Sequence, residues 1–335
     1  MRDVAAAAGV SFKTVSRVIN MEPLVDQLTV TRVEQAIEDL QYRRNGLARN
    51  LRKGIRQLTI GLIIEDLSNP FYAMLAQAVE EVADWNHHSI ILTSSREDPE
   101  RESRLVTDLL RRGVEGLLVV PAARDHRYLA PELRRGVRVV FLDRTPSGVD
   151  ADTFVAENRE GARRAVEHLV SYGHRRIAFL ADPMTLETSA DRYRGYADAL
   201  GGAGLVLDER LVQAGSTSVD SAQTATRQLL AMDDPPTAIF AQNNRNCLGA
   251  LRALRSVGAR LALVGFDDFE LATMLPTPVS VIANDPHEMG RRGAARLFER
   301  LSGAAGPPVR TLLPTRLIAR GSGEIPVGAV DWGLA

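Results

Sequence analysis

Several polar residues stand directly after apolar runs, where a parallel sheet would present them to a ligand. Asp143 follows residues 139–142, Asn243 follows 238–242 and Asp267 follows 263–266. The loops after the strands of an open parallel sheet line its ligand crevice. A carboxylate accepts hydrogen bonds from hydroxyl groups, and an amide donates to ring and hydroxyl oxygens. These residue types at these positions predict a site for a small polyhydroxy molecule such as a sugar.

Three further residues complete this expected site. Arg192, near the start of an expected helix, would supply a guanidinium donor, and Phe71 and Tyr72 would supply aromatic faces for the C–H side of a sugar ring. Ordinary structural roles remain open as alternatives. The pair Asp267-Asp268 could cap a following helix, and Asn243 could cap its own. Arg192 could form a solvated ion pair with Asp191 or Glu187.

The segment 7–20 has the pattern of a helix end, a tight turn and a second helix. Gly9 supplies the backbone freedom of a sharp turn, Ser11 is a favoured N-cap, and Val10, Val15 and Val18 have the spacing of a buried helix face. The opposite face carries residues able to contact phosphates and base edges: Phe12, Lys13, Thr14, Ser16, Arg17 and Asn20. This arrangement predicts a DNA-binding helix-turn-helix, with a surface helical hairpin as the alternative.

The expected contacts of this second helix divide into two kinds. Phe12, Lys13 and Arg17 would contact bases in the major groove, with Arg17 as a bidentate donor to a guanine. Thr14, Ser16 and Asn20 would hold phosphates.

Charge is distributed unevenly over the 335 residues, although the net charge is only −1. Residues 1–56 carry ten Lys and Arg against six acidic residues, a charge of +4, which leaves −5 for the remainder. A basic head on a mildly acidic body is typical of a DNA-binding protein with a separate second function. The length predicts about two domains.

Membrane insertion and secretion are not indicated by the sequence. It has no run of about 18 apolar residues and no basic-then-apolar leader. The single cysteine, Cys247, cannot form an intramolecular disulfide, in keeping with a reducing compartment, and is expected to be a small packed side chain. We therefore expect a cytoplasmic protein without membrane contact.

Motifs for catalysis and for cofactor binding are missing from the sequence. It has no Gly-x-Gly-x-x-Gly after a strand, no Gly-Lys-Ser/Thr phosphate loop and no Gly-x-Ser-x-Gly elbow. His87, His88 and His174 lack further His or Cys residues at metal-ligand spacing and are expected at the surface or in turns. We expect no catalytic residues, no metal and no cofactor.

From residue 57 onward, apolar runs of about six residues alternate with helical stretches. This alternation predicts parallel sheets covered on both faces by helices. The expected strands are 58–64, 89–93, 116–120, 137–142, 177–181, 238–241 and 261–264, and the expected helices are 71–85, 101–112, 159–172, 190–203, 221–232 and 246–257. Upstream, Asp26 is expected to cap a third helix of the head, lined on one side by Val30, Val33, Ile37 and Leu40.

The runs Arg2-Asp3-Val4-Ala5-Ala6-Ala7-Ala8-Gly9-Val10-Ser11 and Thr14-Val15-Ser16-Arg17-Val18-Ile19-Asn20 resemble the opening signature of the LacI/GalR (lactose-repressor) family of bacterial transcription regulators, and the similarity continues almost to the C-terminus. The resemblance implies an α/β fold: an all-α helix-turn-helix head (1–44), a hinge helix (45–56), a periplasmic-binding-protein-like core of two Rossmann-like lobes (57–322) and a tail (323–335). The N-lobe would take 57–155 and 284–315, and the C-lobe 156–283 and 316–322.

The hinge implied by the resemblance would contact DNA through Asn45, Ala48 and Leu51. Leu51 would enter a central base step from the minor groove and kink the duplex, with Ala48 packed beside it. The alternative is that Leu47 and Leu51 are an ordinary i, i+4 pair on a linker helix.

The resemblance also implies that Asp143, Arg192, Asn243 and Asp267 hold a small-molecule effector. This chain departs from the family at Asn244, where the family has Asp, and at Asn284, where Gln is usual. We include Asn284 among the expected effector-binding residues.

The function so implied is an allosteric transcriptional repressor, which binds a pseudo-palindromic operator under the control of a sugar or nucleobase-like effector in the cleft. One recognition helix contacts one half-site, so the protein would act as a homodimer, and the tail lacks the leucine heptads of a tetramer. The alternative is a cytoplasmic small-molecule sensor with an impaired DNA-binding head. The short N-terminus and the missing family arginine and proline, at Val30 and Arg44, would permit that.

Overall fold

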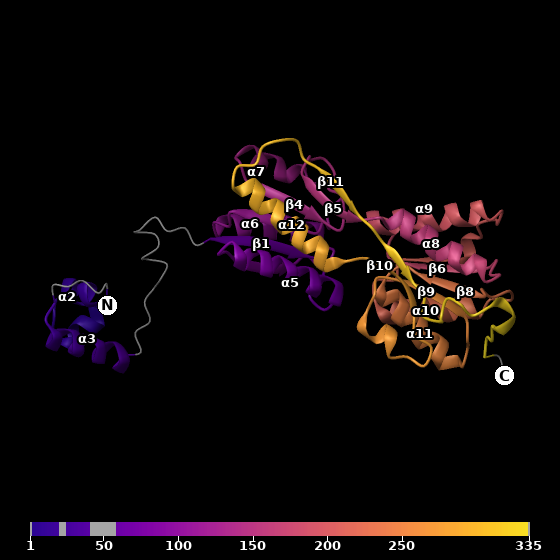
Figure 1. The fold of residues 1–335 in the computed structure, drawn as a ribbon, viewed down its shortest axis with the longest axis horizontal. Coiled ribbons are helices and arrows are strands. Elements are labelled where there is room, and N and C mark those ends of the chain that lie inside the picture. Colours follow the sequence, from indigo (N-terminus) through magenta and orange to yellow (C-terminus); the bar gives the residue numbers. More distant parts are fainter. Residues whose placement is uncertain (1, 20–24, 41–57, 334–335) are drawn as a thin grey trace. The chain divides into compact units, whose positions relative to one another are not determined.

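The computed structural model describes residues 2–19, 25–40 and 58–333 and divides the chain into two compact units, residues 1–57 and 58–335 (Figure 1). Four of the predicted DNA-contact residues, Asn20, Asn45, Ala48 and Leu51, lie outside the described residues. In the part of the chain that is described, every helix is too short or too polar to cross a lipid bilayer.

Among its described residues, the first unit has the helices α1 (Arg2–Ala8), α2 (Phe12–Ile19) and α3 (Gln27–Asp39). Gly9 adopts a left-handed φ of 64° between α1 and α2, and Ser11 accepts a hydrogen bond from the Thr14 backbone N–H at 3.0 Å. Asp26 accepts one from the Thr29 N–H at 3.0 Å, which confirms the predicted cap of α3. These caps satisfy N–H groups that a helix leaves open at its first turn.

A small apolar core joins the three helices of the head. Val4, Val15 and Val33 are fully buried, and Val10, Val18 and Ile37 pack against them. The prediction of Leu40 as a core residue was wrong. Helix α3 ends at Asp39, and Leu40 follows as its C-cap with 46% of its surface exposed, while Ala36 lies in the core instead.

The second unit contains two six-stranded sheets, each the centre of one lobe (Figure 1). In the N-lobe the strand order is β11-β5-β4-β3-β1-β2, and all neighbours are parallel. Its strands are β1 (Thr59–Ile64), β2 (Ser89–Ser94), β3 (Gly116–Val119), β4 (Arg138–Leu142), β5 (Asp152–Ala156) and β11 (Arg310–Leu313). Its helices are α5 (Pro70–Trp85), α6 (Pro99–Arg111), η1 (Arg127–Leu129), α7 (Ala130–Arg134) and α12 (Pro286–Leu301).

In the C-lobe the order is β12-β10-β9-β8-β6-β7, parallel except for the antiparallel pair β10 and β12. The strands are β6 (Ile177–Ala181), β7 (Val212–Ala214), β8 (Ala238–Ala241), β9 (Ala262–Phe266), β10 (Ser280–Ala283) and β12 (Arg316–Ile318). The helices are α8 (Asn158–Ser171), α9 (Glu187–Gly202), η2 (Glu209–Leu211), α10 (Val219–Leu230), α11 (Asn244–Val257), η3 (Glu270–Thr273) and η4 (Val327–Ala329).

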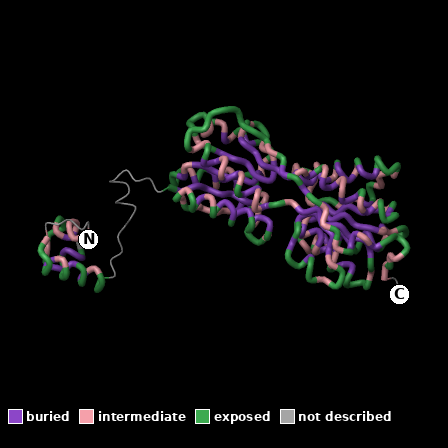
Figure 2. Tube along the Cα trace, viewed as in Figure 1, coloured by how far each residue is buried: buried purple, intermediate pink, exposed green. Residues whose placement is uncertain are grey.

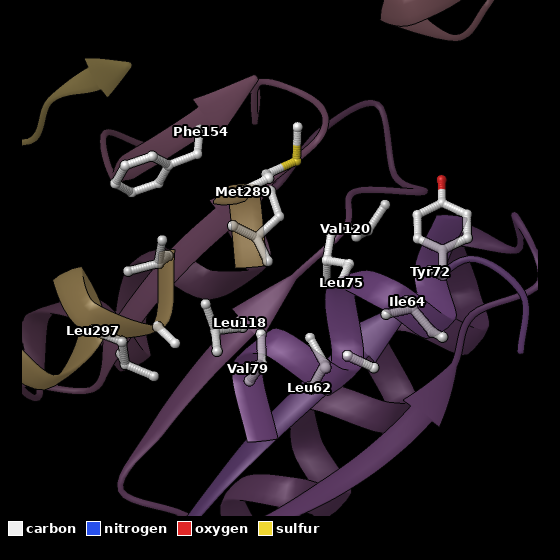
Figure 3. Packing of buried hydrophobic residues seen from close by; sticks show 14 of the residues in the cluster. Leu62, Ile64, Tyr72, Leu75, Val79, Leu118, Val120, Phe154, Met289 and Leu297 are labelled. Atoms are coloured by element: carbon white, nitrogen blue, oxygen red, sulfur yellow. The ribbon is translucent and has the colours of Figure 1, made fainter. Parts of the chain in front are cut away.

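The central strands of both sheets are buried along their length (Figure 2). Because alternate residues of a strand point to opposite faces of its sheet, and both faces are covered, these strands are apolar throughout. In β1, Ile60, Leu62 and Ile64 pack against α5 and α12, whereas Ile63 packs on the other face with residues of α6. Figure 3 shows the first of these clusters, with the ring of Tyr72 at one end and its hydroxyl directed away from the apolar residues.

The chain passes between the two sheets three times. It leaves the N-lobe after β5, returns after β10 to form α12 and β11, and crosses again from β11 to β12. Residues 323–333 then lie against the C-lobe, where Ile325 is buried and the Trp332 Nε1–H donates to the Pro236 carbonyl at 3.0 Å. Such a crossover places the carboxyl ends of strands from both lobes around one cleft.

The seven strands predicted from the sequence are confirmed, with ends that shift by two residues or fewer. The prediction omitted β5, β7, β10, β11 and β12. Of the histidines, His87 is exposed, and His174 directly follows the turn at residues 172–173 before β6, in keeping with the prediction. The burial of His174 was not expected. The residue is fully buried, with its ring nitrogens 2.9 Å from the Thr237 hydroxyl and 2.8 Å from the Ile325 carbonyl. Cys247 is buried as expected.

Candidate effector site and DNA-contact helix

Arg192 of α9 is the central cation on the C-lobe side of the cleft. It is 5% exposed, and its Nε donates to the Asn158 side chain at 2.9 Å, while Nη1 donates to the Gln242 carbonyl. Its guanidinium carbon lies 3.7 Å from the centre of the Phe266 ring, and Nη2 lies 3.7 Å from Asp267. The alternative of a surface pair with Asp191 or Glu187 is therefore wrong for Arg192, because the side chain is directed inward.

Asp143 and Asp267 occupy equivalent positions in the two lobes. Each follows a central strand, β4 or β9, and each adopts a left-handed backbone, with φ of 68° and 66°. The N–H of each donates to the next strand of its sheet, to Phe154 at 2.8 Å and to Ile282 at 2.9 Å. Aspartate tolerates this strained conformation better than most residues, and such strain is concentrated at functional sites.

The carboxyl group of Asp267 is buried with incomplete partners. Burial raises its pKa to about 6, against the opposing effect of the Arg192 guanidinium and of Asn284. The Asp268 carboxylate accepts from the adjacent Phe269 N–H at 2.9 Å, and η3, which follows, has Phe269 as its N-cap residue and no side-chain cap. The capping alternative is therefore wrong for both aspartates, and Asp267 lines the cavity.

Tyr72 and Arg144 surround Asp143 on the N-lobe side. The Tyr72 hydroxyl donates to Glu65 at 2.8 Å and lies 3.1 Å from Asp143, and burial together with these carboxylates raises its pKa. Arg144 is 5% exposed and lies 2.9 Å from Glu65 and 2.7 Å from Glu97. Although burial opposes it, this set of acidic neighbours raises the pKa of Arg144.

Asn243 caps its own helix, as the alternative proposed. Its Oδ1 accepts from the Asn246 N–H at 2.8 Å, and its Nδ2 donates to Asp182 at 2.8 Å. Burial raises the pKa of Asp182, which also accepts from Asn246 at 3.0 Å. The cap holds Asn243 at the end of β8 and still leaves it on the cavity wall.

One small cavity of about 30 Å³ brings six of the seven predicted effector residues together: Phe71, Tyr72, Asp143, Arg192, Asn243 and Asp267. The seventh, Asn284, is half-buried between β10 and α12, where the chain returns to the N-lobe, and does not line this cavity. A larger cavity of about 1030 Å³ shares Glu65, Asp182 and Arg245 with it. Both have wall residues from both lobes.

Several polar residues of these walls were not predicted from the sequence: Glu65, Glu97, Arg144, Asp182, Gln242 and Arg245. Glu65 directly follows β1, Asp182 follows β6 and Gln242 follows β8, so the same strand-end signal could have found these three. Arg245 lies in α11, and no motif marks it.

Helix α2 presents the described members of the predicted DNA-contact set away from the core. Phe12 is 45% exposed, Lys13 is exposed, and Thr14, Ser16 and Arg17 are half-buried, whereas Val15 between them is fully buried. The Thr14 hydroxyl lies 2.8 Å from that of Ser11, at the first turn of the helix. The exposed face thus combines an aromatic, two cations and two hydroxyls.

Comparison with known proteins matches both units. Residues 1–45 match the model of bacterial regulatory proteins of the lacI family, and residues 166–323 match that of the periplasmic binding protein-like domain. The ribose operon repressor of Escherichia coli (strain K12) is 31% identical over 328 residues, which cover 96% of this chain and 99% of the relative.

Two solved structures are similar to the chain over 96% of its length and 98% of their own. The lac repressor dimer bound to operator and the anti-inducer ONPF has a TM-score of 0.75 at 30% identity. The complex of the transcriptional regulator CelR with cellobiose has a TM-score of 0.72 at 33% identity. The chain belongs to the lacI family of bacterial regulatory proteins, with a helix-turn-helix for DNA and a periplasmic-binding-protein-like core.

Proposed function

We propose that this regulator is a cytoplasmic repressor that binds a pseudo-palindromic operator as a homodimer and is controlled by a sugar held between its lobes. The observation that carries the sugar assignment is the pair Asp143 and Asp267. Both have a strained, left-handed backbone, and their carboxylates line one cavity together with the buried Arg192. Carboxylates accept from sugar hydroxyls, and a guanidinium donates to ring oxygens. Relatives named for ribose and cellobiose support the assignment.

Each residue of the proposed site has a distinct role. Asp143 and Asp267 accept hydrogen bonds from hydroxyl groups, Arg192 and Asn243 donate to oxygens, and Phe71 packs on the C–H face of the ring. Tyr72 holds Asp143 from the N-lobe side. Asn284 lies where the chain returns to the N-lobe, and its amide opposes the rise in the pKa of Asp267.

A ligand bound between the two lobes could control DNA binding because it contacts both of them. A sugar that contacts both lobes changes their preferred arrangement, and we propose that residues 45–56 transmit this change as a hinge to the head, residues 1–44. Coupling of this kind is typically about 1 to 3 kcal/mol. Phe12, Lys13 and Arg17 contact bases, whereas Thr14, Ser16 and Asn20 hold phosphates. In the hinge, Asn45, Ala48 and Leu51 contact the minor groove.

The direct test is selection of bound sequences from a random DNA pool with the full-length protein. A homodimer of this kind enriches two half-sites of opposite orientation at a fixed spacing, with a flexible base step between them. Enrichment of a single half-site without a symmetric partner would contradict the dimeric mechanism.

A further inference from the structure

Carboxylates outnumber cations on the cleft walls. The inner cavity of about 30 Å³ is lined by four acidic side chains against three basic ones: Glu65, Asp143, Asp182 and Asp267 against Arg144, Arg192 and Arg245. The outer cavity of about 1030 Å³ adds Asp66, Glu97 and Asp125 against Arg96 and Arg124. The cleft walls therefore carry more formal negative than positive charge, which disfavours an anion.

The three guanidinium groups of the inner cavity are already engaged by the protein. Arg144 contacts Glu65 and Glu97 and donates to the Pro121 carbonyl at 2.8 Å. Arg245 contacts Glu65 at 3.4 Å and also pairs with Asp66.

Arg192 donates to Asn158 and to Gln242, and its Nη2 lies 3.7 Å from Asp267. A phosphate or carboxylate that bound Arg144 or Arg245 would displace their carboxylate partners, and one that bound Nη2 of Arg192 would lie beside the Asp267 carboxylate.

The buried polar atoms that lack a hydrogen-bond partner point to the complementary ligand. On the cavity walls they include Oδ1 of Asp267 and Oε1 of Gln242, which are acceptors, against one donor, Nε of Arg144. A buried acceptor without a partner is costly, and a ligand that donates to it recovers that cost. Hydroxyl groups donate, whereas a phosphate dianion only accepts.

We propose that the effector is a polyhydroxy compound without an anionic group, so that the cleft excludes sugar phosphates and sugar acids. This inference rests on the proposed sugar-controlled function and narrows its ligand class. Exclusion follows from charge: an anion in a buried site beside Asp143, Asp182 and Asp267 meets like charges in a low dielectric.

Matched pairs of compounds test the exclusion with the full-length protein. Ribose is compared with ribose 5-phosphate, glucose with glucose 6-phosphate, and cellobiose with cellobionate, by thermal-unfolding shift and by calorimetry. The expected result is that at least one neutral member binds and that its anionic partner binds at least 100-fold more weakly. An anionic member that binds as tightly as its neutral partner would overturn the exclusion and leave the sugar-controlled function intact. Failure of all six compounds to bind would count against the sugar assignment itself and remove the basis of the inference.

A gain-of-binding variant tests the cause. Glu65→Gln removes the carboxylate that engages both Arg144 and Arg245, so the affinity for glucose 6-phosphate should rise at least 10-fold over the natural protein. The matched control is Glu81→Gln, which removes a half-exposed carboxylate paired with His287 outside the cleft walls and should leave phosphate affinity unchanged. Asp182→Asn, which removes a second cleft carboxylate, should shift the affinity in the same direction as Glu65→Gln. No gain in either cleft variant, or an equal gain in the control, would overturn the electrostatic explanation.

Discussion

Arg245 of the C-lobe lies 3.4 Å from Glu65 of the N-lobe and also pairs with the neighbouring Asp66. Beside this contact, the Asn244 side chain donates to Asn69 Oδ1 of the opposite lobe at 2.9 Å. Arg245 is 21% exposed and Glu65 16%, so solvent screens the ion pair only in part. The protein's own side chains therefore hold the lobes together at the cleft.

A double-mutant cycle measures this contact between lobes. Arg245→Gln and Asp66→Asn should show a coupling of about 1 to 2 kcal/mol in the free energy of unfolding by urea. The matched control pair joins Arg252, on the same helix as Arg245, to Asp220 of α10; the two side chains are 60% and 88% exposed and should couple by less than about 0.5 kcal/mol. Equal coupling in the two cycles would contradict a stronger interaction between the lobes at the cleft than at an exposed surface pair.

Arg192 is expected to stabilise the fold through the buried carboxylate beside it. Arg192→Met leaves Asp267 buried beside an apolar side chain and should lower the free energy of unfolding by about 3 to 5 kcal/mol. Adding Asp267→Asn removes the uncompensated charge and should restore part of the loss. The measurement is the free energy of unfolding of both variants by urea denaturation. Strictly additive losses of stability for the two substitutions would contradict an interaction between Arg192 and Asp267.

Glu97 should make stability depend on pH. Burial raises its pKa from 4.5 to about 7, with Arg144 opposing and Glu65 adding to the rise. Between pH 4.5 and about 7, Glu97 is therefore protonated in the folded state but ionised in the unfolded state. The free energy of unfolding falls as the pH rises through this range, and the contribution of this proton is lost above about pH 7.

Glu97→Gln mimics the protonated side chain. It should be more stable than the natural protein at pH 8, by about 1 to 3 kcal/mol, and should lose this advantage at pH 5. The measurement is the free energy of unfolding at both pH values. Glu100→Gln, at an 89% exposed side chain, serves as control and should show no such difference. A pH-independent effect of Glu97→Gln would contradict the shifted pKa.

Arg17 on α2 tests base recognition. Arg17→Ala should weaken operator binding by about 1 to 3 kcal/mol and relax the preference at one base pair, because a bidentate contact discriminates between bases. Arg32→Ala on α3 also removes one positive charge and should weaken binding to all sequences alike. Binding to a panel of single-base operator variants distinguishes the two, and a uniform loss with Arg17→Ala would refute the base contact.

The order of strands and helices was predictable because both sheets are buried on two faces, which produces continuous apolar runs. Two of the omitted strands, β5 and β7, depart from that pattern. Strand β5 begins with Asp152, a buried carboxylate that Arg296 and Arg300 of α12 neutralise at 3.0 and 2.7 Å, some 150 residues later in the chain. Strand β7 is only half-buried, so its residues are not uniformly apolar.

Site residues at the end of a strand, such as Asp143 and Asp267, were predictable from the sequence. The contacts of a site residue were less predictable where its partners lie far away in the sequence. Arg192 has acidic neighbours in sequence that resemble a surface pair, and only the fold directs it toward Asp267 and the Gln242 carbonyl. Arg245 contacts Glu65, which lies 180 residues earlier in the chain. No local sequence pattern indicates such a contact.

The central claim is that a ligand bound between the lobes controls the affinity of the helix-turn-helix for DNA. Its most direct measurement is the affinity of the full-length protein for its selected operator, with and without a saturating neutral sugar from the matched set. The account predicts a change of about 5- to 150-fold. An operator affinity that the saturating sugar leaves unchanged would contradict it.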